Sequence, residues 1–130
     1  MRYWYHTEFL ENGATIELIS IGIVAEDGRE YYAVNADATW DRIAQHQWLS
    51  RNVMPHLGDG RVPQHVIRMQ VEQFLRHAVG TDQPEAPELW GWYAAYDHIA
   101  LAATVRHDGR LPGLVADADQ RYPPRTATPW

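Results

Sequence analysis

The sequence predicts an α/β fold in which a mixed sheet is flanked by helices. Three observations support this prediction. Short β-prone runs fill most of the first third of the chain, an Asp-Gly turn joins two of them, and segments with helical periodicity surround a later β-prone run. A strand that is reached through a helical crossover normally joins its sheet in parallel. We therefore expect a three-stranded antiparallel meander with one parallel strand added.

The first three strands are predicted near residues 2–9, 15–25 and 29–35. The first run reads Arg-Tyr-Trp-Tyr-His-Thr-Glu-Phe, and the second is an apolar stretch rich in β-branched residues. Asp27-Gly28 follows the second run, and this dipeptide supplies the positive φ that a tight hairpin turn needs. Three successive strands with short links indicate the meander.

The rest of the chain is predicted to form three helices and one strand, near residues 40–50, 63–79, 88–93 (the strand) and 96–106. N-cap candidates for the first helix lie between Asp37 and Thr39. Pro63 suits the first turn of the second helix, and Gly80 suits the position just past its end. Asp97 lies where the strand gives way to the last helix, a position where open α/β sheets place ligands.

The bulk composition limits the classes of protein. The chain has 130 residues, a hydrophobic share of 45% and no cysteine, which fits one domain without disulfides or thiolate metal sites. It shows no signal peptide or membrane-length apolar run, so we expect a cytoplasmic protein with no membrane partner. The net charge of −6 argues against a basic nucleic-acid-binding surface. It does not exclude a nuclease whose acidic residues bind metals that then contact phosphates.

A candidate site is expected on the first strand. Side chains alternate between the two faces of a strand, so His6 and Glu8 point the same way. Two-metal nucleases collect oxygen ligands for Mg²⁺ from a same-face acidic pair on a first strand and an Asp that opens a later helix. Glu8 and Asp97 fit this pattern, but His6 stands where the pattern needs an Asp.

Four segments carry a resemblance to a known family: Tyr5-His6-Thr7-Glu8-Phe9, residues 15–24, residues 26–34 and Ala95-Tyr96-Asp97-His98. They are similar to a bacterial 3'-5' exoribonuclease of the DEDD, or DnaQ-like, superfamily, of the polyadenylate-specific 3'-exoribonuclease AS type. The resemblance covers roughly residues 2–103 and implies a ribonuclease H-like fold. It also implies two-metal hydrolysis, with Mg²⁺ or Mn²⁺, of RNA phosphodiester bonds from a single-stranded 3' end.

The resemblance assigns roles residue by residue. Glu8 matches the Glu of the family's Asp-x-Glu motif and Asp97 matches its second motif, so both are implied as catalytic residues and metal ligands. The main chain around Phe9 and Leu10 is implied to hold the terminal nucleotide. His6 replaces the Asp of the first motif, and the third motif, His-x4-Asp, does not occur after Asp97.

Two interpretations of His6 remain open. As a metal ligand beside Glu8 and Asp97, its imidazole would suit Mn²⁺ or Zn²⁺ better than Mg²⁺, which prefers oxygen. In the second interpretation it is a neutral side chain in an inactive site. The loss of one carboxylate favours the second, because less negative charge is left to hold two divalent cations.

The exonuclease domain is predicted over residues 1–105 and an irregular tail over 106–130. The tail shows no periodicity and has three prolines in its last eight residues, so we expect it to be poorly ordered. The domain is then C-terminally truncated, and one hypothesis is a frameshift, which the gene's nucleotide sequence tests.

Three functions follow from these observations. The first is a 3'-5' exoribonuclease whose activity is impaired. The second is a catalytically inactive protein that binds RNA or a protein partner, and the third is a non-functional truncated product. Self-association into a homo-oligomer is left open.

Overall fold

The structure is a computed structural model, and it describes residues 1–76, 86–91, 94–106 and 119–121. The elements in chain order are β1 (Arg2–Glu11), β2 (Ile16–Ala25), β3 (Glu30–Val34), α1 (Trp40–Gln45), α2 (Gln47–Asn52), the 3₁₀ helix η1 (Met54–His56), α3 (Gln64–Arg76), β4 (Glu88–Gly91), α4 (Ala94–Val105) and β5 (Asp119–Arg121). Among these residues, no helix is both long and apolar enough to cross a membrane.

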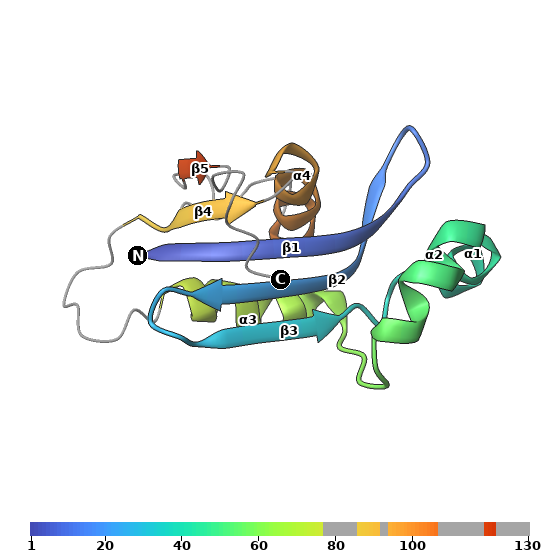
Figure 1. The fold of residues 1–130 in the computed structure, drawn as a ribbon, viewed down its shortest axis with the longest axis horizontal. Coiled ribbons are helices and arrows are strands. Elements are labelled where there is room, and N and C mark those ends of the chain that lie inside the picture. Colours follow the sequence, from blue (N-terminus) through green and yellow to red (C-terminus); the bar gives the residue numbers. More distant parts are fainter. Residues whose placement is uncertain (77–85, 92–93, 107–118, 122–130) are drawn as a thin grey trace.

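The strands form one mixed sheet in the order β3-β2-β1-β4-β5 (Figure 1). β1 pairs antiparallel with β2, β2 pairs antiparallel with β3, and β4 joins the other edge of β1 in parallel. This arrangement confirms the predicted meander with an added parallel strand. β5 pairs in parallel with β4. No strand was predicted beyond residue 106, so β5 corrects the sequence analysis, because three residues are too few to show a period.

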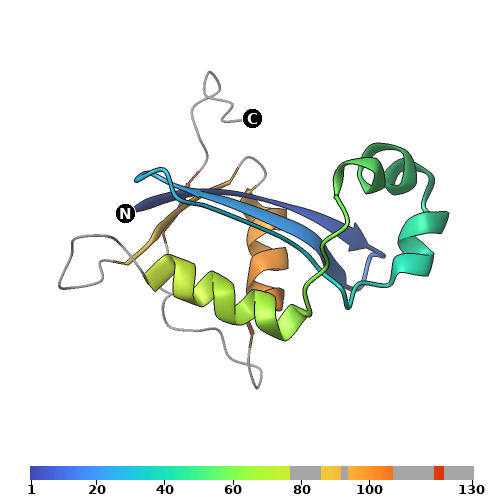
Figure 2. The same cartoon turned by 90° about the horizontal axis from the view of Figure 1, so that it is seen from below.

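Helices α3 and α4 cover the same face of the sheet (Figure 2). On β1 this face carries Tyr3 and Tyr5, which are buried in the main core cluster together with Ile67 and Val71 of α3 and Leu101 of α4. Side-chain alternation sends His6 and Glu8 to the opposite face. The main core therefore fixes the strand that carries two of the three candidate site residues.

The single helix predicted near residues 40–50 is two short helices, α1 and α2, which lie with η1 beyond the ends of β1 and β3 (Figure 1). His46 ends α1 with extended backbone angles and begins α2, where its Nδ1 accepts the Leu49 N–H at 3.3 Å. Ile43 and Leu49 are both buried in a second core cluster. Six residues along one continuous helix would place them about 120° apart around its axis, so the break lets both side chains reach the same core.

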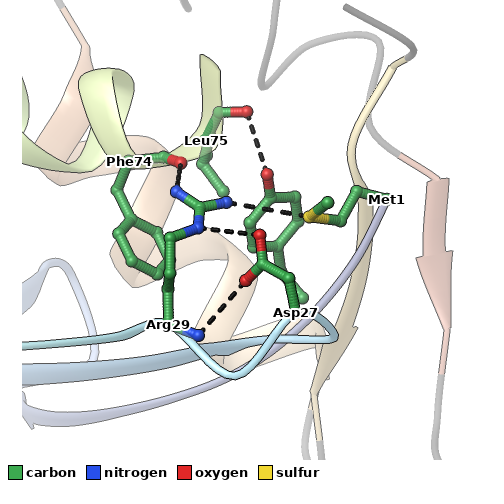
Figure 3. Close-up of polar contacts among 6 residues, drawn as sticks. Met1, Asp27, Arg29, Phe74 and Leu75 are labelled. Atoms are coloured by element: carbon green, nitrogen blue, oxygen red, sulfur yellow. Dashed lines mark hydrogen bonds and ion pairs between the residues drawn. The ribbon is translucent and has the colours of Figure 1, made fainter. Parts of the chain in front are cut away.

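Contacts from the β2–β3 turn cap the C-terminal end of α3 (Figure 3). Gly28 supplies the positive φ of this turn, 88°, as the Asp-Gly pair predicted. The Arg29 guanidinium donates to Asp27 Oδ2 at 2.8 Å and to the Phe74 carbonyl at 3.2 Å, and the Tyr3 hydroxyl donates to the Leu75 carbonyl at 3.1 Å. The last carbonyls of a helix have no partner within the helix. These two side chains therefore fasten α3 to the sheet.

The other predicted boundaries differ from the observed ones by one to two residues where they can be compared. β1 extends to Glu11, and α4 begins at Ala94 and ends at Val105. Predicted helix residues 77–79 and strand residues 92–93 lie outside the described residues. At the start of α3, Asp37 Oδ2 accepts the N–H of Gln64 at 2.9 Å, so this predicted N-cap residue of the earlier helix caps α3 instead.

Candidate active site

The predicted site residues His6, Glu8 and Asp97 come together. His6 and Glu8 lie two positions apart on β1, and Asp97 lies in the first turn of α4. Nε2 of His6 is 3.1 Å from Oε1 of Glu8, and Nδ1 of His6 is 3.7 Å from Oδ1 of Asp97. The first distance is a hydrogen bond and the second is an ion-pair separation. The imidazole ring thus lies between the two carboxylates.

Thr7 fixes the position of the Asp97 carboxylate through two hydrogen bonds. The Asp97 side chain is buried, and Oδ1 accepts two hydrogen bonds from Thr7, from the main-chain N–H at 2.9 Å and from the hydroxyl at 2.7 Å. Burial raises the pKa of the Asp97 carboxyl, but the neighbouring His6 ring and the two hydrogen bonds from Thr7 outweigh it and hold the pKa below its usual value. Asp97 is therefore an ionised carboxylate at neutral pH.

His6 carries a positive charge at neutral pH. The Asp97 and Glu8 carboxylates raise the pKa of its imidazole to about 9, against the opposing effect of burial. An imidazolium donates from both ring nitrogens and accepts from neither. The cluster therefore pairs one cationic ring with two carboxylates.

The donor atoms fit a two-metal site poorly. Two Mg²⁺ ions require several carboxylate oxygens in a shared, water-accessible arrangement. Across the described parts of the chain, no group of three or more His, Asp or Glu side chains is arranged to hold a metal ion. One possible metal-ligating atom, Oδ2 of Asp97, is buried and has no hydrogen-bond partner. The described residues thus lack the ligand set of a complete two-metal site.

Phe9 and Leu10 lie on opposite faces of β1, as alternation along the strand requires. The register of β1 against β2 shifts between Glu8 and Phe9, where Ile19 of β2 is the extra residue. Phe9 stacks on Tyr96 of α4, with ring centroids 6.0 Å apart and an interplanar angle of 7°. Leu10 packs into the second core cluster. Of the two, Phe9 lies beside the helix turn that carries Asp97.

A pocket of about 370 Å³ adjoins the carboxylate cluster, and sequence reasoning did not find it. Its lining includes His6 and Glu8, Ser20 and Gly22 of β2, Tyr32 of β3, Asn52 of α2 and His56 of η1. These residues come from five elements, so no local sequence motif predicts the pocket. One signal was present, because Gly22 interrupts a strand that is otherwise rich in isoleucine.

Comparisons with known proteins agree with the 3'-5' exoribonuclease part of the resemblance found in the sequence. The profile of the Rv2179c-like 3'-5' exoribonuclease domain family matches residues 1–121. Two relatives are the 3'-5' exoribonuclease Rv2179c of Mycobacterium tuberculosis (strain ATCC 25618 / H37Rv) and the 3'-5' exoribonuclease MT2234.1 of Mycobacterium tuberculosis (strain CDC 1551 / Oshkosh). Each is 48% identical over 105 residues, which is 78% of this chain and 59% of the relative. The chain thus matches 59% of the length of these relatives.

Proposed function

Because the chain belongs to the Rv2179c-like 3'-5' exoribonuclease domain family, we propose that it engages the single-stranded 3' end of RNA and that its hydrolytic activity is impaired. The observation that supports impaired activity is the position of the His6 ring between two carboxylates. Its Nε2 lies 3.1 Å from Oε1 of Glu8, and its Nδ1 lies 3.7 Å from Oδ1 of Asp97. A cationic ring in that position supplies the charge balance that a metal ion would otherwise supply.

The proposed chemistry is that of the DEDD type, in which Mg²⁺ or Mn²⁺, when bound, would supply Lewis acidity to the attacking water and to the leaving oxygen. Glu8 and Asp97 are the proposed remaining ligands. His6 would add a nitrogen donor, which suits Mn²⁺ better than Mg²⁺, only after its imidazolium loses a proton. Thr7 orients Asp97 through the two hydrogen bonds to Oδ1. The main chain of Phe9 and Leu10, next to Glu8, is the proposed support for the terminal nucleotide.

The second candidate function is RNA binding without hydrolysis. The same observation favours it, because the His6 cation already offsets one of the two carboxylates, Glu8 and Asp97, and so weakens the attraction for a metal ion. The two functions share the RNA 3' end as ligand. They differ in whether nucleotides are released.

The test compares the wild-type protein with His6→Asp. Mn²⁺ affinity is measured by calorimetry, and nucleotide release is measured on a single-stranded RNA labelled at its 5' end. His6→Asp should bind Mn²⁺ more tightly, because it replaces a positive ring by a hard, negative oxygen ligand. Turnover should remain low, because the His-x4-Asp motif is absent after Asp97 and loss of a general base typically costs about 10²–10⁴-fold.

The matched control is His65→Asp, which makes the same change at an exposed position of α3. It should leave Mn²⁺ affinity unchanged. RNA binding without nucleotide release by the wild-type protein would support the second function. Efficient Mg²⁺-dependent digestion by the wild-type protein would show that the activity is not impaired.

A further inference from the structure

Residues 40–62 form a helical lobe that exposes a tryptophan, and we propose that Trp48 and Arg51 of this lobe bind single-stranded RNA upstream of its 3' end. The Trp48 ring would stack on a base, and the Arg51 guanidinium would pair with a phosphate. The lobe contains α1, α2 and η1 and lies beyond the ends of β1 and β3 (Figure 2). This second contact depends on the proposed engagement of RNA 3' ends, but its two residues belong neither to the carboxylate cluster nor to the adjoining pocket.

The Trp48 ring is exposed although the helix that carries it is packed. α2 contacts the second core cluster through Leu49, whereas the Trp48 side chain is 58% exposed. Within the described residues, the Trp48 ring forms no hydrogen bond, ring stack or cation–π contact. Trp40 of the same lobe differs, because its Nε1 donates to the Ala36 carbonyl at 3.3 Å and the Arg61 guanidinium lies 3.7 Å from its ring centroid. A single exposed apolar side chain is common on protein surfaces, so the neighbours of Trp48 decide what its exposure means.

Trp48 lies between a residue that lines the pocket and an arginine. Around a helix axis, a side chain four positions later lies about 40° to one side and a side chain three positions later about 60° to the other side. Asn52, which lines the pocket together with Glu8, is on one side of Trp48, and Arg51 is on the other. The Asn52 amide also donates to the Trp48 carbonyl at 3.0 Å. An RNA strand that leaves the carboxylate cluster along this wall of the pocket therefore reaches the Trp48 ring and then Arg51.

The charge of the lobe differs from that of the whole chain. Residues 40–62 contain three arginines and two aspartates and so carry a net charge of +1, whereas the chain carries −6. Arg42 and Arg51 are exposed, and neither forms an ion pair with another described residue. Phosphates of a single strand attract guanidinium groups, and every base offers a face on which an aromatic ring can stack. An exposed indole beside such arginines therefore suits single-stranded nucleic acid better than an apolar protein surface.

The experiment measures how the affinity for RNA depends on the length of the RNA. Calorimetry gives the affinity of the full chain for unlabelled oligoadenylates of two to about eight nucleotides, a range that includes the smaller sites of single-strand binding proteins. It is run in EDTA, and again with Mn²⁺ on oligomers with phosphorothioate linkages, so that binding is read without turnover. The affinity of the wild-type protein should rise with length, because only the longer oligomers reach the Trp48 ring.

The variants remove one contact each. Trp48→Ala should weaken binding of the longest oligomer by about 5- to 150-fold, the effect of losing one base stack, and should leave dinucleotide binding within about twofold of wild type. Trp48→Tyr keeps an aromatic ring and should recover most of the affinity. Arg51→Gln should reduce the slope of log affinity against log salt concentration by about 0.7, because one phosphate contact is lost.

Two residues of α3 supply the matched controls. The Met69 side chain is also 58% exposed, so Met69→Ala removes an equally exposed apolar side chain away from the lobe. Arg76 is exposed at the end of α3 that lies far from the lobe (Figure 2), so Arg76→Gln removes the same charge as Arg51→Gln. Both variants should keep the length dependence and the salt slope of the wild-type protein.

The outcomes separate the Trp48 contact from the proposed function. If the wild-type protein binds RNA and folded Trp48→Ala has the same affinity at every length, the Trp48 contact is overturned while the proposed function stands. An equal loss for the dinucleotide and the longest oligomer would also overturn it, because Trp48 would then act at the 3' end itself. Unchanged RNA binding with altered sedimentation of Trp48→Ala would overturn it in favour of an interface between copies of the chain. Should Trp48→Ala not fold, the salt slope of Arg51→Gln decides. Failure of the wild-type protein to bind RNA of any length would overturn both proposals.

Discussion

Replacing Thr7 by Val tests how the fold holds the most buried carboxylate of the site. Thr7 and Asp97 are 90 positions apart in the sequence, and both are almost completely buried. The substitution removes the 2.7 Å hydrogen bond from the Thr7 hydroxyl to Asp97 Oδ1 and leaves the 2.9 Å bond from the main-chain N–H in place. Valine has nearly the shape of threonine, so packing of β1 against α4 is conserved.

The expected magnitude follows from the charge on the acceptor. A hydrogen bond to an ionised group contributes about 1.5–3 kcal/mol, compared with about 0.5–1.5 kcal/mol for a neutral pair. Thr7→Val should therefore lower the free energy of unfolding by about 1.5–3 kcal/mol. For a domain of this size the melting temperature should fall by roughly 5–12 °C.

The loss should depend on pH in a defined direction. The folded pKa of Asp97 lies below its ordinary value of 3.8, so its stabilisation is present above pH 3.8 and is lost as the pH falls through the folded value. Thr7→Val raises that folded pKa. The difference in stability between the two proteins should thus be full at pH 7 and shrink in acid.

The assay is urea denaturation at pH 7 and at several acidic values, with Thr104→Val as control. Thr104 is also a buried threonine, but its hydroxyl donates to the neutral Ala100 carbonyl at 2.8 Å. The control should cost less at pH 7 and show no dependence on acid. Equal losses for both variants, or a Thr7→Val loss that does not shrink in acid, would refute the assignment of Asp97 as an ionised carboxylate held by Thr7.

Three further predictions concern charge. The pKa of His6 is raised above its ordinary value of 6.5 to about 9, so the stability that its charge contributes is full below pH 6.5 and is lost as the pH rises through 9. The free energy of unfolding of the wild-type protein should therefore exceed that of His6→Gln by more at pH 6 than at pH 10. A difference that stays constant with pH would contradict this prediction. Arg29→Ala should lower the free energy of unfolding by about 1–3 kcal/mol, measured in urea, because the Phe74 carbonyl loses its hydrogen-bond donor while the Tyr3 bond to the Leu75 carbonyl remains. An unchanged urea midpoint would contradict this prediction. Asp97→Asn should weaken Mn²⁺ binding by at least about tenfold by calorimetry, whereas Asp59→Asn, at an exposed position, should not.

Local patterns in the sequence were sufficient to predict much of the fold and the shared face of His6 and Glu8. Alternation along β1 placed His6 and Glu8 on one face, and the Asp-Gly pair placed the hairpin turn. Helical spacing identified the buried face of α3, where Ile67 and Val71 lie in the core. Each of these features depends on neighbours within a few residues, so the sequence carries them directly.

Tertiary structure alone decided which distant groups meet. The pairing of Asp97 with Thr7, the Arg29 cap on α3 and the pocket around Gly22 each join elements that lie far apart in the chain. The distance between two residues along the chain does not predict whether such contacts form. They form because the sheet and its helices bury a shared core, which brings polar groups from different elements close together. The identity of His6 could be read from the sequence, but its charge could not, because that charge is fixed by the two carboxylates that folding places on either side of its ring.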